Sequence, residues 1–143
     1  MPEPLPRLLF VCVENSCRSQ MAEGFAHASG QGRIAAFSAG SQPSGQVNAR
    51  AIQFMRERGI DLSAQRSKGL DDLPAGHWDY VVTMGCGDAC PHLPARQRRD
   101  WDLPDPKHLG DDAFRAVRDR IERLVLGLIA EAAPAGATEE LQN

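Results

Sequence analysis

The sequence has no long hydrophobic run. Its longest apolar stretches, residues 8–13 and residues 124–130, are far shorter than the roughly 18 residues that would span a bilayer. The opening Met-Pro-Glu-Pro-Leu-Pro places no basic residue ahead of an apolar stretch of signal-peptide length. We therefore expect a cytoplasmic protein that is neither exported nor bound to a membrane.

Positive charge is scarce as well. Lys and Arg together number 16 against 19 for Asp and Glu, which gives a net charge of -3. This balance argues against a general nucleic-acid-binding protein. Arg96, Arg98 and Arg99 form a local basic cluster, but three aspartates follow it between residues 100 and 105. We interpret this cluster as part of a solvated loop.

Cysteine is too rare for a disulfide framework. The sequence holds 4 cysteines, and they fall into the pairs Cys12/Cys17 and Cys86/Cys90. In a chain that is not exported, such pairs indicate thiol chemistry or a metal site. Zinc at the second pair would need histidines such as His92, and no other cysteine pair completes four ligands there. We therefore expect thiol chemistry and no metal.

The length and the hydrophobic patterns predict one α/β domain. We assign residues 1–133 to this domain and residues 134–143 to a flexible tail. Residues 85–108 are rich in Gly and Pro, and we expect them to be irregular. The alternation of strands and helices predicts a flavodoxin-like, three-layer fold with a four-stranded parallel sheet and helices on both faces. The expected strands are residues 8–13, 34–38, 65–66 and 78–84, the expected helices are residues 20–29, 46–58 and 111–132, and a helical turn is expected at 70–73.

The turn between the first strand and the first helix carries the chemistry. It contains neither Gly-x-Gly-x-x-Gly nor Gly-Lys-Thr/Ser, so we expect no nucleotide cofactor. Loop N–H groups over a helix N-terminus bind a tetrahedral oxyanion, and Arg18 can hold two of its oxygens. The same positive field stabilises a thiolate at Cys12 and makes it a nucleophile, to which Ser19 can donate a hydrogen bond. Asn15 tolerates the left-handed backbone that such a loop needs.

Taken singly, Cys12 could be a small core residue and Arg18 a surface cation. Their spacing as Cys-x5-Arg-Ser between a buried strand and a helix favours the oxyanion site. The predicted oxyanion-binding residues are Val13, Glu14, Asn15, Ser16, Cys17 and Arg18.

Residues 11–24, VCVENSCRSQMAEG, resemble the low-molecular-weight tyrosine phosphatase superfamily, and in particular its arsenate reductase branch. The similarity covers nearly the whole chain and implies the low-molecular-weight phosphatase fold. One difference is Glu14, where phosphatases usually carry Gly in CxGNxCRS. The further matching segments are SAGS at 38–41, RGIDLS at 58–63, VVTM at 81–84 and WDLPDP at 101–106.

Both branches of the superfamily need a general acid for the leaving oxygen. Asp105, which precedes Pro106, matches the Asp-Pro motif of the family, and Asp102 is its nearest rival. Phosphatases typically continue this motif with aromatic residues that hold a phosphotyrosine ring. Lys107 and His108 follow here instead, so tyrosine phosphatase activity is disfavoured.

The second cysteine pair favours the reductase branch. Reduction of arsenate to arsenite needs two electrons, and a second thiol supplies them, whereas ester hydrolysis needs no further thiol. The resemblance implies that Cys12 attacks arsenate, that Cys86 then attacks Cys12, and that Cys90 forms a Cys86–Cys90 disulfide for an external reductant. The order of Cys86 and Cys90 stays open, because their Cys-x3-Cys spacing is shorter than in the best-known members. We interpret Cys17 as a bystander.

The resemblance also implies the partners. These are arsenate, with phosphate or sulfate as competing oxyanions, and thioredoxin as the reductant of a monomeric enzyme. Glutaredoxin or a small thiol is the alternative electron donor. Two other functions stay open, namely a phosphatase of phosphate monoesters and a non-catalytic regulator that binds arsenic or a metal.

Part of this branch holds a potassium ion beneath the loop. The matching positions here are Asn15, Glu23 and Ser38, but Lys68 stands where an acidic residue would complete the site. An ammonium group at this position can pair with Glu23 and replace the cation. We therefore predict that the activity does not depend on potassium.

Overall fold

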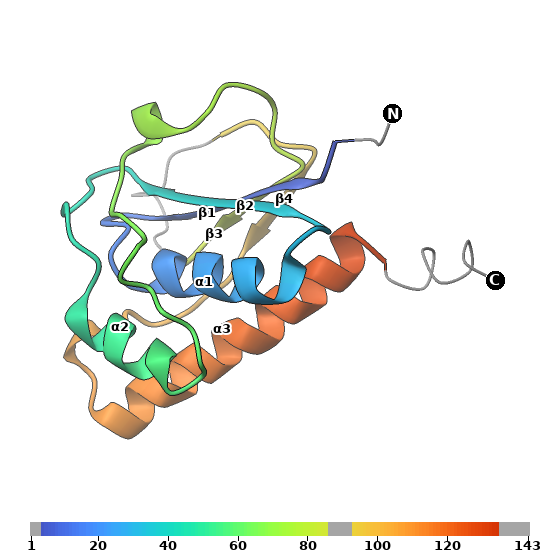
Figure 1. Ribbon diagram of the computed structural model, residues 1–143. Helices are drawn as coiled ribbons and strands as arrows, with labels where there is room; N and C mark the ends of the chain where they lie inside the picture. Colours follow the sequence, from blue (N-terminus) through green and yellow to red (C-terminus); the bar gives the residue numbers. More distant parts are fainter. Residues whose placement is uncertain (1–3, 86–92, 135–143) are drawn as a thin grey trace.

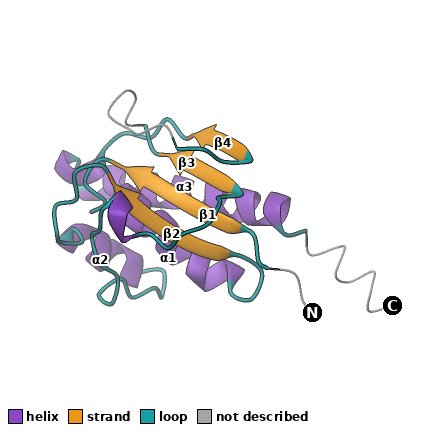
Figure 2. Cartoon of the chain, turned by 90° about the horizontal axis from the view of Figure 1, so that it is seen from above, coloured by secondary structure: helices purple, strands orange, loops and turns teal. Residues whose placement is uncertain are grey.

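The computed structural model describes residues 4–85 and 93–134. Four parallel strands form one sheet in the order β2-β1-β3-β4, and Figure 2 shows this order from above. This is the strand order of flavodoxin-like sheets, and it confirms the predicted fold class. The strands are β1 (Arg7–Cys12), β2 (Ala35–Gly40), β3 (Tyr80–Thr83) and β4 (Gln97–Asp100); the helices are α1 (Arg18–Gly30), α2 (Ala49–Arg56), α3 (Asp111–Ala132) and the 3-10 turns η1 (Leu70–Asp72) and η3 (Pro106–His108).

Strand β1 is central and carries the functional loop at its end. Residues 8–12 of the strand are buried, as its continuous apolar sequence predicts for a strand covered on both faces. Cys12 pairs with Gly40 of β2, and Val11 pairs with Thr83 of β3 on the other side. The chain therefore leaves β1 between two flanking strands, at the carboxyl edge where ligands bind in open α/β sheets.

All three α-helices pack on one face of the sheet. Figure 1 shows α1 and α3 side by side beneath the strands, with α2 across one end of α3. Phe10 of β1 and Phe25 of α1 belong to this core, where Phe54 and Phe114 join α2 to α3 with ring centroids 4.9 Å apart. The site loop and the start of α1 are thus fixed to a rigid base.

The other face of the sheet differs from the expectation of a second helical layer. Among the described residues, the 3-10 turn η1 and loop residues cover Leu9, Val11 and Trp78 there. The Arg7 guanidinium lies over the Trp78 ring, 4.2 Å from its centroid. The connection from α2 to β3 first packs on the helical side, through Leu62, and reaches this face only from about residue 70. There it forms loop apart from η1, so a short turn stands where a helix was expected.

The predicted strand at residues 65–66 is wrong. The nearby Gly69 makes an isolated bridge with Gly40 of β2, but residues 65–66 take no part in it. They lie against α1, where the Arg66 carbonyl accepts a hydrogen bond from Gln20 Nε2 at 2.8 Å. A polar side chain of α1, and no strand ladder, thus pairs with this backbone.

The fourth strand is instead β4, in the region expected to be irregular. Its sequence Gln-Arg-Arg-Asp shows no apolar alternation, and the prediction of a solvated arginine loop is wrong for Arg98 and Arg99. Backbone pairing with β3 holds this edge strand. Charged side chains suit an exposed sheet edge, and Arg99 pairs with Glu131 of α3 and lies 5.5 Å from the Tyr80 ring centroid.

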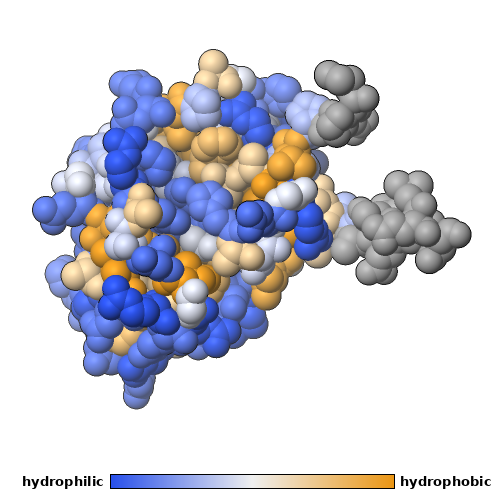
Figure 3. Space-filling model, in the orientation of Figure 1, coloured by the Kyte–Doolittle hydropathy of each residue, from blue (hydrophilic) through white to orange (hydrophobic). Residues whose placement is uncertain are grey.

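Apolar and hydrophilic residues are interspersed on the outer surface. Figure 3 shows this for the face of Figure 1, where apolar residues gather in separate patches among hydrophilic ones. None of the helices within residues 4–85 and 93–134 has the length and apolar character needed to cross a membrane.

Candidate active site

The loop after β1 turns its carbonyl groups away from a small pocket. The carbonyls of Val13, Glu14 and Ser16 accept hydrogen bonds from the backbone N–H groups of Gln42, Ser44 and Asn48 at 2.8–3.0 Å. In a trans peptide the N–H points opposite to the preceding carbonyl, so the amides of residues 14, 15 and 17 point to the inner side of the loop. Inward-facing amides at the start of α1 make an anion-binding nest.

This pocket has a volume of about 160 Å³ and gathers the predicted site residues. Five of the six predicted oxyanion-binding residues line it, while Asn15 lies buried behind it. The lining residues are Cys12, Val13, Glu14, Ser16, Cys17, Arg18, Asp105 and Lys107.

Asn15 shapes the loop from behind. Its φ of 50° is in the left-handed region, as predicted, and it is the only non-glycine residue with positive φ among the described residues. The fully buried side chain donates from Nδ2 to the hydroxyls of Ser19 at 2.8 Å and Ser38 at 3.0 Å. Its Oδ1 accepts from Gln20 Nε2 and from the Lys68 backbone N–H, both at 2.9 Å. These four bonds compensate for the strained backbone.

Cys12 lies at the floor of the pocket, and its Sγ is 2.8 Å from the Ser19 Oγ. Because Asn15 already donates to that oxygen, the Ser19 hydroxyl proton is free to point at the sulfur. A hydrogen bond of this direction stabilises a thiolate in preference to a thiol. The predicted partnership of Cys12 and Ser19 is therefore present.

Arg18 joins the loop to two distant parts of the chain. Its Nη1 donates to the Met84 carbonyl at 2.6 Å and to the Leu103 carbonyl at 2.9 Å. Its Nη2 lies 4.0 Å from Asp105 Oδ2. The planar guanidinium is thus fixed against the pocket wall, with a second nitrogen near the candidate acid.

Asp105 reaches the pocket from the opposite side. It caps η3, where its Oδ1 accepts from the Lys107 backbone N–H at 3.1 Å, and its side chain is half-exposed. Asp102, the rival candidate, is absent from the described residues that line the pocket. The geometry favours Asp105 as the acid that a bound oxyanion would meet.

Cys17 shares the pocket but differs from Cys12. Burial raises the pKa of the Cys17 thiol to about 12, and the nearby charges of Asp105 and Cys12 add to this increase. Because the thiolate is the nucleophile, a thiol with this pKa is inert at neutral pH. This agrees with the interpretation of Cys17 as a bystander.

Cys86 and Cys90, together with His92, lie outside the described residues. The first of the two described segments ends at Gly85. A Cβ atom at this position would meet Leu103 backbone atoms and lie 3.5 Å from Arg18 Nη1. The positive φ of 82° and this close approach both require glycine.

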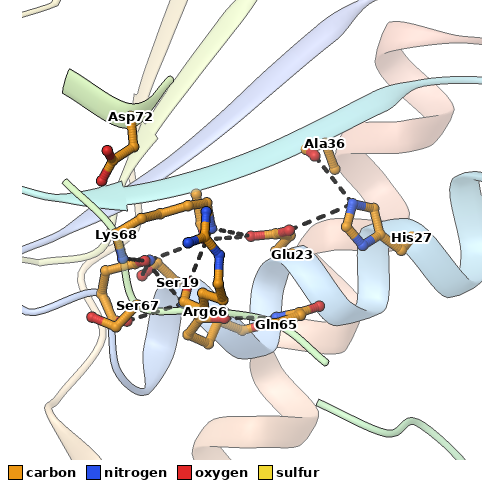
Figure 4. A network of polar contacts seen from close by, with 12 residues as sticks. Ser19, Glu23, His27, Ala36, Gln65, Arg66, Ser67, Lys68 and Asp72 are labelled. Carbon is orange, nitrogen blue, oxygen red and sulfur yellow. Dashed lines mark hydrogen bonds and ion pairs between the residues drawn. The ribbon is translucent and has the colours of Figure 1, made fainter. Parts of the chain in front are cut away.

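Lys68 lies behind the loop, at the position where an acidic residue was expected to complete a potassium site. Figure 4 shows the Glu23 carboxylate between Lys68 and His27. Lys68 Nζ lies 3.3 Å from Glu23 Oε1 and 3.3 Å from Ser38 Oγ, so the predicted pairing of Lys68 with Glu23 is present. His27 is half-exposed and approaches Glu23 Oε2 at 3.6 Å.

One feature of the pocket was missed by sequence reasoning. Lys107 Nζ pairs with Oε1 of Glu14, a residue 93 positions earlier in the chain, and both residues line the pocket. The only available signal was that Lys107 follows Asp105 by two residues.

The parallel sheet, with a small pocket where β1 meets α1 and with a cysteine at its floor and an arginine in its wall, defines an α/β protein whose candidate site lies at the carboxyl edge of the sheet. The family model for low molecular weight phosphotyrosine protein phosphatases matches residues 7–138, and the chain belongs to this family.

Its curated relatives come from the reductase branch. The chain is 42% identical over 130 residues to the glutaredoxin arsenate reductase of Synechocystis sp., with 89% of this chain and 98% of the relative covered. It is 40% identical over 119 residues to an arsenate reductase of Staphylococcus aureus strain Newman, with 80% and 89% covered.

Solved structures agree with this assignment. An arsenate reductase in its phosphate-binding state matches with a TM-score of 0.81 and 40% identity, covering 90% of this chain and 100% of that one. A low molecular weight protein tyrosine phosphatase from T. tengcongensis matches with a TM-score of 0.75 and 27% identity, covering 88% and 99%.

Proposed function

We propose that this protein is an arsenate reductase that uses Cys12 as its nucleophile. The observation that carries the proposal is the hydrogen bond between Cys12 Sγ and Ser19 Oγ at the floor of an amide-lined pocket. Relatives of about 40% identity are named arsenate reductases, and similar structures have been solved in phosphate-binding, oxidized and reduced states.

In the first step the Cys12 thiolate attacks arsenate, held by the loop amides and Arg18. An S–As bond forms, the As–O bond to one arsenate hydroxyl breaks, and this hydroxyl leaves as water with a proton from Asp105. Asp105 is placed for this role because it lines the same pocket as Cys12, with its Oδ2 4.0 Å from Arg18 Nη2. Arsenic keeps its oxidation state in this step.

In the second step the Cys86 thiolate attacks the sulfur of Cys12. The S–As bond breaks, its electron pair stays on arsenic, and arsenite leaves as a Cys12–Cys86 disulfide forms. The Cys90 thiolate then attacks Cys86, which frees Cys12 and leaves a Cys86–Cys90 disulfide. Support comes from the covalent position of Cys86, directly after Gly85 beside Arg18.

We propose thioredoxin as the reductant of that disulfide, in the cytoplasm, where such dithiol proteins are kept reduced. A thioredoxin-dependent arsenate reductase of Corynebacterium glutamicum matches with a TM-score of 0.72 and 30% identity. Glutaredoxin is the alternative, because the Synechocystis relative carries it in its name.

The test is arsenite release under NADPH with either thioredoxin and its reductase or glutaredoxin with glutathione and its reductase. Wild type is compared with Cys12→Ser, Cys86→Ser and Cys90→Ser. We expect wild type to turn over and none of these three variants to do so, and we expect one arsenite per molecule from Cys90→Ser, which would place Cys86 second. Cys17→Ser is the matched control and should turn over.

Hydrolysis of phosphate monoesters is the second candidate, since a tyrosine phosphatase shares the fold. It predicts turnover of p-nitrophenyl phosphate that needs Cys12 but not Cys86. If wild type hydrolyses this ester and releases no arsenite with any donor, the reductase proposal is wrong.

A further inference from the structure

We propose that Lys107 is a further oxyanion-binding residue, and that its ion pair with Glu14 sets how tightly the pocket holds a divalent oxyanion. The inference rests on the proposed function insofar as the same pocket is the substrate site. It adds a cation at the mouth of the pocket to the loop amides and Arg18.

The pair lies at the open end of the pocket. Cys12 is 4% exposed, whereas the side chains of Glu14 and Lys107 are 43% and 23% exposed, although all three line the same pocket. Glu14 belongs to the loop and Lys107 to η3, so the ion pair bridges the two sides. The two charges are therefore more accessible to solvent than the sulfur at the floor of the pocket.

The backbone of Lys107 is held independently of its ammonium group. Its N–H donates to Asp105 Oδ1 at 3.1 Å, and its carbonyl accepts from Arg50 Nη1 at 3.1 Å. Arg50 Nη2 is itself 3.0 Å from Asp111 Oδ1 at the start of α3. Removal of the ammonium alone should therefore leave η3 and Asp105 in place.

The charges that face the pocket are balanced. Arg18 and Lys107 are cationic, while Glu14 and Asp105 carry carboxylates. The Glu14 Oε1 atom is buried and has no hydrogen-bond partner among the described residues, so the Lys107 ammonium is its one compensating contact there. Loss of that ammonium leaves an uncompensated carboxylate facing an incoming dianion. Loss of the Glu14 charge leaves the ammonium free to pair with the anion.

These two losses should change the affinity of the pocket for an anion in opposite directions. One charge a few ångströms from a bound dianion, partly screened by water, changes affinity roughly tenfold. Lys107→Met should therefore weaken binding of inorganic phosphate about tenfold, and Glu14→Gln should tighten it severalfold. The double variant should lie within about threefold of wild type, because it removes both charges and leaves the net charge of the pocket unchanged.

The experiment is calorimetric titration of the reduced full-length protein with inorganic phosphate at pH 8 and low salt. Lys107→Arg keeps the charge and should bind within about threefold of wild type. Arg120→Met, an exposed change on α3, removes the same charge away from the pocket and should stay within about twofold. Circular dichroism checks that each variant is folded.

The proposal is overturned if folded Lys107→Met binds phosphate as wild type does, if Glu14→Gln weakens binding, or if wild type binds no phosphate. Arsenate reduction plays no part in this readout. A wild type that binds phosphate with the expected pattern but releases no arsenite would refute the reductase function and leave this inference standing.

Discussion

Lys68 reaches Glu23 beneath the oxyanion loop, with Nζ 3.3 Å from the carboxylate Oε1 and 3.2 Å from the Arg66 carbonyl. The ammonium therefore contacts oxygen atoms of the kind that would otherwise surround a monovalent cation. Through Ser38 and Asn15, the same network continues to Ser19 and to the sulfur of Cys12.

We expect arsenate reduction to be independent of potassium, because a covalently attached cation already occupies this position. Initial rates in potassium chloride should equal those in choline chloride at the same ionic strength. Lys68→Asp should lower the rate and make the remaining activity rise with potassium, since it replaces the ammonium with a carboxylate ligand. A wild-type rate that rises with potassium would contradict this account.

The thiols of Cys12 and Cys17 should differ in reactivity. Because burial raises the pKa of Cys17 to about 12, its thiolate fraction at pH 8 is on the order of 10⁻⁴. Iodoacetamide at pH 8 should alkylate Cys12 in the folded protein and leave Cys17 unmodified, as read by peptide mass spectrometry. Alkylation in urea is the control, and there both should react.

Ser19→Ala should slow the reaction of Cys12. The variant removes the hydrogen bond to the sulfur and leaves an Asn15 Nδ2 donor with one acceptor fewer. We expect the alkylation rate of Cys12 at neutral pH to fall about tenfold, which corresponds to about 1.4 kcal/mol. Ser19→Thr keeps the hydroxyl and should retain most of the rate; equal rates in Ser19→Ala and wild type would argue against the assigned role.

Two glycine substitutions should change stability in opposite directions. A Cβ at Gly40 would lie 2.4 Å from the Val13 carbonyl oxygen and 2.9 Å from the Asn15 nitrogen, both in the loop backbone. Gly40→Ala should therefore lower the free energy of unfolding by about 2 kcal/mol and weaken phosphate binding.

Gly127→Ala is the matched control for that substitution. Gly127 lies in α3, and a Cβ there would have open space around it, with no contact within 4 Å beyond the backbone of its own helix and its chain neighbours. Alanine should raise the free energy of unfolding by about 0.5–1 kcal/mol, because helical glycine costs more backbone entropy. Urea unfolding followed by circular dichroism measures both changes.

The parts of the fold that sequence could predict are those specified by local pattern. Three such features carry their signal within a few neighbouring residues, and the structure has all of them. They are the apolar run of β1, the loop from Cys12 to Ser19 and the stripe of buried apolar residues along α3. Strand β4 carries no such signal. Its ladder with β3 comes from tertiary pairing of an edge, which polar residues accept readily.

The candidate site divides in the same way. Asn15 could be expected in the left-handed region from its residue type and its motif. The pairing of Glu14 with Lys107 joins residues far apart in the chain, and neither residue type specifies its partner. The roles of Cys86 and Cys90 stay predictions, as does the domain boundary at residue 133.

The guanidinium group of Arg18 makes two kinds of contact at once. While Nη1 is committed to the Met84 and Leu103 carbonyls, the rest of the guanidinium remains available toward the pocket. Arg18 thus lines the pocket and at the same time joins the chain that follows β3 to the chain that follows β4. Arg18 therefore holds both the wall of the candidate site and the start of the segment that leads to Cys86. A shorter side chain at this position would loosen both at once.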